Sequence, residues 1–268
     1  MGSHYPQTTS DPSLKRLLSW LRGVVYWLIT AGPIGLIAGR LFRHRCFDCF
    51  GPIVLPASVS YDIAGAIIFG AYEHPERKLI QQWLPTDLDC IELGCSISVI
   101  SRIILHKLEA TRRVFAVEAS ETLLDFATRN ATAAGFGERF TPIHGAVHYI
   151  GEYVNFCEHG EHIRGKVAST SLSDGTPTRC ITLAQIVQAY GLKRFSLVMD
   201  IEGSEFDLVA KDAYSLINCQ ALIVEVHGDD IKKSGFVEAL SGQGFTLVEV
   251  RHAVFAFTRK HAANSFYS

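Results

Sequence analysis

The chain has 268 residues, a formal net charge of -2 with neutral histidines, 48% hydrophobic residues and only 19% charged residues. A chain of this length and apolar content can bury the core of one large domain, with or without a small extension, so intrinsic disorder is excluded. No basic run interleaved with aromatic residues is present to follow a phosphate backbone, which argues against DNA or RNA as an obligatory partner.

The N-terminal part of the chain is apolar. The stretch between Gly23 and Gly39 contains no charged residue, and basic residues flank it on both sides. Its length is at the short limit for crossing a bilayer, and Pro33 in its middle would break or kink a helix. Three interpretations stay open: these residues pack as helices on the following domain, they associate with a membrane surface, or they form a signal sequence.

The apolar N-terminal stretch and the cysteine spacing also predict the domain organisation and the cellular compartment. We expect residues 1–50 to form an apolar, helical extension and residues 51–268 to form the main domain. Seven cysteines without regular spacing fit a reducing compartment. The close pair Cys46 and Cys49 lacks the second pair that a structural zinc site needs, so we interpret its spacing as chance. We therefore expect a cytoplasmic protein, with membrane association through residues 17–39 as the open alternative.

From about residue 86, short apolar runs alternate with helical periodicity, which predicts an α/β fold with a doubly wound, mostly parallel sheet. The last two apolar runs are separated by only two residues, Arg251 and His252, which predicts an antiparallel hairpin. The section 151–178 is rich in Gly, Ser, Thr and Pro and is predicted to be irregular. The predicted strands are 88–94, 113–118, 140–147, 195–200, 221–226, 245–250 and 253–258.

The ends of the first two predicted strands carry residues that suit a nucleoside. The first strand ends at Glu92, Leu93 and Gly94, where a glycine lets the backbone approach a ligand and a carboxylate accepts hydrogen bonds. The second strand ends at Glu118, at the spacing from which an acid binds both hydroxyls of a ribose. Each feature alone is explained by a turn or a solvated acid, but together they favour a nucleoside ligand at the carboxyl edge of the sheet.

The most specific motif follows the predicted strand 195–200. The run from Asp200 to Glu205 places carboxylates at the end of a buried strand and at the start of a helix. This run resembles the signature of the FkbM family of S-adenosylmethionine-dependent methyltransferases, in which an apolar strand ends in Asp-x-Glu-Gly-x-Glu. Further pieces occur in the family's order over about residues 70 to 258: Tyr72-Glu73, Val117-Glu118, Asn130, Gly145-Ala146, Thr182-Leu183 and Glu225-Val226-His227.

This resemblance implies a fold, a cofactor and a reaction. The fold is the Rossmann-like fold of class I methyltransferases, a mostly parallel doubly wound sheet with a C-terminal antiparallel hairpin, here preceded by the apolar helical extension. The reaction is O-methyl transfer to a hydroxyl of a sugar, polyketide or related small metabolite. The cofactor is S-adenosyl-L-methionine, and the resemblance implies as its binding residues Glu92, Gly94, Ser96, Glu118, Ala119 and Ala146.

Methyl transfer to a hydroxyl also needs alignment of the reactants and removal of a proton. The resemblance places Asp200 and His227 at the ends of neighbouring strands, so either is a candidate base, and Glu202 is the third catalytic candidate. Structural roles compete with these, because Asp200 could cap the following helix and His227 could be a hydrogen-bonded histidine at a loop edge.

The acceptor is expected to be a small molecule, bound by Tyr72, Glu73 and Glu225, with long irregular segments around residues 40–72 and 151–178 shaping its pocket. In an alternative form of the site, Asp200 and Glu225 hold a divalent metal that lowers the pKa of the acceptor hydroxyl. We favour it less, because neighbouring carboxylates also cap helices or bind hydroxyls directly. The sequence makes no prediction about the oligomeric state.

One loop departs from the family pattern. The family's first loop usually has the form Asp-x-Gly-Ala-Asn-x-Gly, and here it is the run from Glu92 to Ser98. Ser96 replaces the asparagine and can still donate a hydrogen bond. Ser98 replaces the last glycine and adds a side chain where the helix begins against the cofactor. This departure predicts weaker cofactor binding, or a divergent member that has lost activity.

Two other classes of protein therefore compete with the methyltransferase. A nicotinamide-dependent oxidoreductase would need the full Gly-x-Gly-x-x-Gly turn, which is missing after Gly94. A catalytically inactive, membrane-associated scaffold would keep the fold and explain both the altered first loop and the apolar N-terminus. Binding of S-adenosylhomocysteine separates both alternatives from the methyltransferase.

Overall fold

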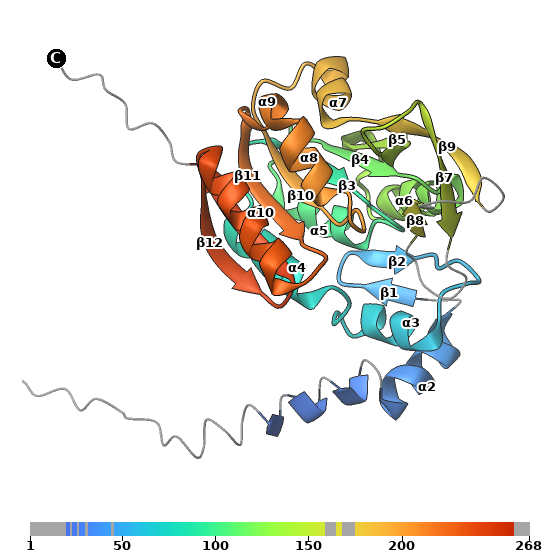
Figure 1. Ribbon diagram of the computed structural model, residues 1–268. Coiled ribbons are helices and arrows are strands. Elements are labelled where there is room, and N and C mark those ends of the chain that lie inside the picture. The colour runs from blue at the N-terminus through green and yellow to red at the C-terminus, as the bar shows by residue number, and fades with distance from the viewer. Residues whose placement is uncertain are drawn as a thin grey trace, which may run out of the picture.

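The computed structural model describes residues 20–21, 23–25, 27–29, 32–43, 46–158, 165–167 and 175–259. Its centre is a seven-stranded sheet with the order β12-β13-β11-β10-β3-β4-β5 (Figure 1). The strands are β3 (Asp89–Leu93), β4 (Val114–Glu118), β5 (Phe140–His144), β10 (Phe195–Met199), β11 (Cys219–Glu225), β12 (Phe245–Arg251) and β13 (Val254–Arg259).

The five strands from β11 to β5 are parallel, and β13 runs antiparallel to both β11 and β12. The predicted doubly wound sheet with a C-terminal antiparallel hairpin is therefore confirmed, and so is the α/β fold class. The second strand of the hairpin, β13, lies between β11 and β12. The edge strand on this side is therefore β12, which comes before β13 in the chain.

Helices cover both faces of this sheet. One core contains side chains of α4 (His74–Trp83), α5 (Val99–Lys107) and α6 (Glu121–Ala133). The other core contains side chains of α7 (Leu183–Tyr190), α8 (Glu205–Lys211), α9 (Ala213–Leu216) and α10 (Asp230–Gly242). Successive residues of β3 alternate between these cores, with Cys90 in the first and Ile91 in the second. A strand buried on both faces is apolar throughout, which explains the continuous apolar runs in the sequence.

The section predicted to be irregular contributes strands to a second sheet, so that prediction was wrong for the residues described there. Its four strands are ordered β6-β9-β7-β8: β6 (Ala146–Val147), β7 (Tyr153–Glu158), β8 (Gly165–Val167) and β9 (Thr176–Ile181). Tyr153 pairs with Arg179, far away in the chain, so the pairing depends on contacts that local patterning does not reveal. Residues 159–164 and 168–174 of the predicted acceptor loop lie outside the described residues.

The N-terminal apolar region ends in α2 (Pro33–Phe42), which packs against α3 (Tyr61–Ile68) (Figure 1). The two helices are very close, because a side chain at Gly39 would overlap the carbonyl oxygen of Tyr61. By length and composition alone, the helix Gly23–Phe42 could cross a membrane, although one such helix is weak evidence of a span. Residues 17–19, 22, 26, 30 and 31 of the expected membrane-associated stretch lie outside the described residues.

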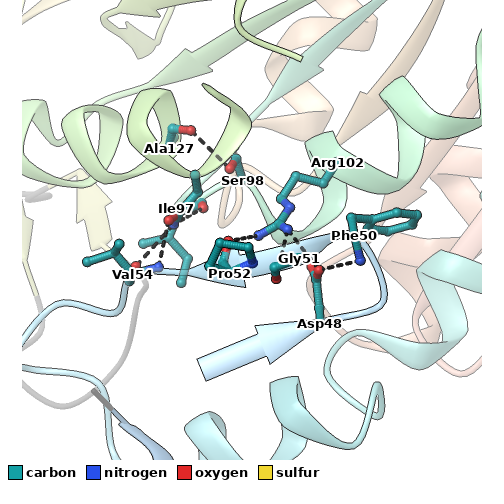
Figure 2. A network of polar contacts seen from close by, with 10 residues as sticks. Asp48, Phe50, Gly51, Pro52, Val54, Ile97, Ser98, Arg102 and Ala127 are labelled. Atoms are coloured by element: carbon teal, nitrogen blue, oxygen red, sulfur yellow. Dashed lines mark hydrogen bonds and ion pairs between the residues drawn. The ribbon is translucent and has the colours of Figure 1, made fainter. Parts of the chain in front are cut away.

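A short hairpin crosses the predicted boundary between residues 50 and 51. Its strands are β1 (Cys46–Asp48) and β2 (Gly51–Ile53), which pair antiparallel. Figure 2 shows how Arg102 of α5 joins this hairpin to the main domain: its guanidinium lies 2.8 Å from the carboxylate of Asp48 and donates to the carbonyl groups of Gly51 and Pro52. The division of the chain at residue 50 stays a prediction, and the hairpin packs with the residues that follow it.

Cys46 and Cys49, which are three residues apart in this region, differ in burial. Cys46 is buried in a small core formed with residues of α3 and α5, and burial raises the pKa of its thiol to about 12. Cys49 lies in the turn and is exposed. The interpretation that their spacing is chance stays a prediction.

Candidate active site

The site lies where the connections of the large sheet diverge. From β3 the chain moves through β4 to β5 on one side, and it returns to place β10 and β11 on the other side. The loops that follow β3 and β10 therefore separate at the carboxyl edge, which is where open α/β sheets bind ligands. A cleft opens there, and its walls include Gly94, Ser96, Glu118, Ala119, Ala146, Asp200 and Glu202.

The loop after β3 has an unusual backbone. Gly94 has a φ of +85°, and a Cβ at this position would overlap the carbonyl oxygen of Asp200 on the neighbouring strand end. The sequence predicted a glycine that lets the backbone approach a ligand; the structure adds that Asp200 requires the glycine in any case. Ser96 and Ser98 also adopt left-handed conformations, with φ of +48° and +68°. The family pattern has asparagine and glycine here, the residues that tolerate this conformation best.

The side chain of Ser98 does not face the cleft, which corrects the expectation that it meets the cofactor. Ser98 is fully buried, and its hydroxyl donates to the carbonyl oxygen of Ala127 on α6 at 3.1 Å (Figure 2). Asn130 of the same helix donates to the carbonyl groups of Ile97 and Val54. These contacts fix the loop from behind, so the serine departs from the family pattern without occupying the cleft.

Glu118, at the end of β4, accepts hydrogen bonds from the loop after β3 and from the residues that follow β4. Its Oε2 accepts a hydrogen bond from the backbone N–H of Ser96 at 2.9 Å, and its Oε1 accepts one from Ser120 at 3.0 Å. The residue is only 7% exposed, yet it lines the cleft. A carboxylate accepts hydrogen bonds, so Glu118 is chemically suited to hydroxyl donors of a ligand in this cleft. Ala119 and Ala146 line the same cleft.

Four carboxylates surround one imidazole at the ends of β10 and β11. Nδ1 of His227 lies 2.9 Å from Oε1 of Glu205, and its Nε2 lies 3.4 Å from Glu202, 3.7 Å from Asp200 and 3.9 Å from Glu225. The hydrogen bond to Glu205, together with the negative charges, raises the pKa of His227 to about 9 against the opposing effect of burial. Without a bound cation, His227 is therefore protonated at neutral pH.

The backbone of the run from Asp200 to Glu205 is strained at Glu202. Glu202 has a φ of +48°, which is uncommon for a residue with a side chain. Left-handed backbone at non-glycine residues costs on the order of 1–3 kcal/mol and occurs preferentially at functional sites. The conformation turns the chain directly after β10, so that Asp200 and Glu202 both line the cleft while Glu205 begins α8 behind it.

Glu92 lies in a smaller cavity behind the first loop, together with Tyr72, Glu73 and Glu76. Burial raises the pKa of Glu92 to about 8, and the pKa of the fully buried Glu76 is also raised well above its ordinary value. At a pKa of about 8, Glu92 is largely neutral at pH 7. The sequence predicted Glu92 as an acceptor for the cofactor, and the structure places it beside the cleft without a direct place in its wall.

Two of the predicted acceptor residues line the main cleft, and the third lines a neighbouring opening. Tyr72 and Glu73 line the main cleft, the cavity behind it and a third opening that also includes Glu225. Sequence reasoning did not select Glu205 as a site residue, although it is the last acid of the Asp-x-Glu-Gly-x-Glu run. It also did not select Glu76, whose only signal was its position near Tyr72 and Glu73 in the sequence.

Comparison with known proteins agrees with the family that the sequence resembles. A family model described as the methyltransferase FkbM domain matches residues 97–252, more than half of the chain. No curated protein matches the sequence.

The solved structures that this chain is similar to are distant in sequence. Ribosomal protein L11 methylase from Lactobacillus delbrueckii subsp. bulgaricus is 13% identical, with a TM-score of 0.43 over 69% of this chain and 77% of that one. Aeropyrum pernix fibrillarin with bound S-adenosyl-L-methionine is 12% identical, with a TM-score of 0.40 over 65% and 67%. A protein of the NADB-Rossmann superfamily from Streptococcus agalactiae is 10% identical, with a TM-score of 0.41 over 68% of this chain and 65%, less than two thirds, of its own.

Proposed function

The chain belongs to the FkbM methyltransferase family, and from that premise we propose that it transfers a methyl group from S-adenosylmethionine to a hydroxyl of a sugar, polyketide or related small metabolite. The observation that carries this proposal is the position of Glu118, a nearly buried carboxylate that lines the cleft at the end of the second parallel strand. An acid at this place is suited to the two hydroxyls of a ribose.

The described residues fit this cofactor. Glu118 would hold the ribose, Gly94 and Ser96 would line the region next to it, and Ala119 and Ala146 present small apolar surfaces beside which a flat base can lie. When bound, S-adenosylmethionine supplies a methyl group on a positively charged sulfur. Glu92, in the adjoining cavity, is proposed to act on the cofactor only through the loop in front of it.

The acceptor is proposed to approach from the side of Asp200 and Glu202, with Tyr72, Glu73 and Glu225 forming its binding surface. Asp200 and Glu202 line the cleft, so their carboxylates can orient a hydroxyl and take its proton. His227 is protonated at neutral pH in the absence of a cation and therefore cannot accept a proton there. We assign proton removal to Asp200, with Glu202 orienting the acceptor and His227 holding both carboxylates in place.

The experiment that tests this proposal is calorimetric titration with S-adenosylmethionine and S-adenosylhomocysteine. We expect micromolar binding by the parent chain and a loss of about tenfold or more in Glu118→Ala, because the two ribose hydroxyls lose a charged acceptor. The matched control is Glu121→Ala, an exposed acid in the first turn of α6, which should bind as the parent does. Absence of binding by the parent would reject the methyltransferase and favour the inactive scaffold.

We also propose that α2 holds the domain on the surface of a membrane. One face of α2 packs on α3, whereas Ile34, Ile37, Leu41 and Phe42 are exposed. Arg40 is exposed beside them and could contact anionic lipid headgroups. A helix with one face packed on a domain and apolar residues on its free face suits contact with a membrane surface better than a full crossing.

A further inference from the structure

The imidazole and carboxylates at the ends of β10 and β11 have the spacing of a metal site. One donor atom from each of Asp200, Glu202 and His227 lies within 4.8 Å of the other two. Two ligand atoms that are each about 2.1 Å from one ion are separated by about 3.0 Å at a right angle and about 3.4 Å at a tetrahedral angle. Nε2 of His227 lies 3.4 Å from Glu202 and 3.7 Å from Asp200, distances that are long for hydrogen bonds and close to those of shared ligation.

The orientation of His227 gives a second, independent indication. Its Nδ1 is hydrogen-bonded to Glu205, whose side chain is completely buried at the start of α8. Metal-binding histidines are generally held in this way, because a carboxylate on one ring nitrogen selects the tautomer that leaves the other nitrogen available for the metal. Nε2 of His227 is buried and has no hydrogen-bond partner among the described residues, and the same is true of Oε2 of the buried Glu205.

The surrounding charges favour a cation. Glu225 approaches Nε2 of His227 at 3.9 Å, and the negative charges of Asp200 and Glu225 contribute to the raised pKa of Glu76. Burying several carboxylates close together is unfavourable unless a positive charge is placed among them. A divalent cation supplies more positive charge at this point than one protonated imidazole.

We propose that Asp200, Glu202 and His227 bind a divalent cation at the acceptor side of the cleft. Two carboxylate oxygens and one imidazole nitrogen form a mixed donor set that suits Mn²⁺ or a related first-row ion. The set differs from the Asp200 and Glu225 pair of the less favoured alternative, because the strained turn at Glu202 and the hydrogen bond from His227 to Glu205 bring two further ligands to the same point. Glu205 is a positioning residue, since it reaches the ion only through His227.

The cation has a defined role in the proposed reaction. Remaining positions around the ion would take water and the acceptor hydroxyl, and coordination lowers the pKa of that hydroxyl. Its proton then passes to the carboxylate oxygen of Asp200 that does not bind the ion, as the oxygen–methyl bond forms and the sulfur–methyl electron pair returns to sulfur. This role rests on the proposed methyl transfer, whereas cation binding itself does not.

The test is titration of the purified, chelator-treated full chain with Mn²⁺ alone, with free Mn²⁺ measured by electron paramagnetic resonance. We expect one bound ion per chain, and affinity lower by about tenfold or more in Glu202→Gln and His227→Gln. Glu205→Gln should weaken binding by about 10- to 100-fold, as expected for a group that orients a ligand. The matched control, Glu238→Gln on the exposed face of α10, should bind as the parent does.

Two further measurements keep the proposal falsifiable. Electron nuclear double resonance of Mn²⁺ on the parent chain detects nitrogen coupling from an imidazole ligand and requires no variant. Glu118→Ala should keep Mn²⁺ binding while losing S-adenosylhomocysteine, which separates a failure of the metal site from a failure of the methyltransferase proposal. Absence of Mn²⁺ binding by the parent, binding without nitrogen coupling, or unchanged affinity in both folded ligand variants would overturn the metal site.

Discussion

Individual side chains in the first loop adapt to an unfavourable backbone. Ser98 keeps a left-handed φ of +68° although glycine would adopt it at no steric cost. Left-handed backbone costs an L-residue roughly 1–2 kcal/mol, and the buried hydrogen bond to Ala127 returns about 1 kcal/mol. The serine is therefore close to neutral for stability, and its hydroxyl is directed to Ala127 and does not line the cleft.

This balance makes a prediction for two substitutions. Ser98→Gly should leave the free energy of unfolding within about 1 kcal/mol of the parent, because relief of strain offsets the lost hydrogen bond. Ser98→Ala keeps the strain and loses the bond, so it should destabilise by about 1 kcal/mol. Urea unfolding measures both. S-adenosylhomocysteine should bind all three proteins equally, and a large gain in affinity for Ser98→Gly would show that the serine does restrict the cofactor.

Glu92 makes the stability of the protein depend on pH. Burial raises its pKa from 4.5 to about 8, so the folded chain keeps a proton that the unfolded chain releases between these values. Its contribution to stability is complete below pH 4.5 and falls as the pH rises through this window. The expected loss between pH 6 and pH 8 is about 2 kcal/mol.

The corresponding variant is Glu92→Gln, which cannot ionise. Thermal unfolding followed from pH 6 to pH 8 should give a flatter dependence in this variant than in the parent, and the variant should be the more stable protein at pH 8. Glu109→Gln, an exposed acid after α5, is the control and should keep the parent's slope. Parallel curves for the parent and Glu92→Gln would mean that Glu92 is ionised in the folded protein.

At the scale of elements, the hairpin β1–β2 is held to α5 by one buried ion pair. Arg102 has no exposed side-chain surface, and the side chain of Asp48 is 6% exposed. Burial raises the pKa of Asp48 although Arg102 acts in the opposite direction, so desolvation offsets much of the attraction. Such a pair contributes little net stability compared with apolar residues, but loss of one partner leaves the other charge buried.

We therefore expect Asp48→Ala to lower the free energy of unfolding by about 3–5 kcal/mol. The double variant Asp48→Leu with Arg102→Met should recover part of this loss, because no buried charge remains. Asp207→Ala is the control, since it removes the exposed pair with Lys211 on α8 and should change stability by less than about 0.5 kcal/mol. Equal effects of the buried and exposed substitutions would contradict the structural role of the pair.

At the scale of the whole molecule, the proposed contact of α2 with a membrane surface makes a prediction. We expect the chain to sediment with vesicles that contain anionic lipid, and Ile37→Glu with Leu41→Glu to weaken this association by about tenfold or more. Ile231→Glu, at a residue 84% exposed on α10, places the same charge elsewhere and should have no effect. Binding of S-adenosylhomocysteine should be unchanged in all variants. Equal sedimentation of every variant would reject α2 as the membrane-contacting element.

The sequence by itself determined the family, the parallel sheet, its terminal hairpin and the strand ends that meet at the cleft. Apolar runs buried on both faces and acids at strand ends are local patterns, and parallel strands bring their carboxyl ends to one edge of the sheet. The order of the residues along the chain is therefore sufficient to assign Gly94, Glu118 and Asp200 to one site.

Only the tertiary structure decided which atoms face one another. The pairing of β7 with β9, the direction of the Ser98 side chain and the contact of Glu205 with His227 join residues that are distant in the chain. Such contacts depend on how whole elements pack, and periodicity reports only which face of an element is buried. For the same physical reason, the sequence could name the carboxylates of the site, but their arrangement around one imidazole required the folded chain.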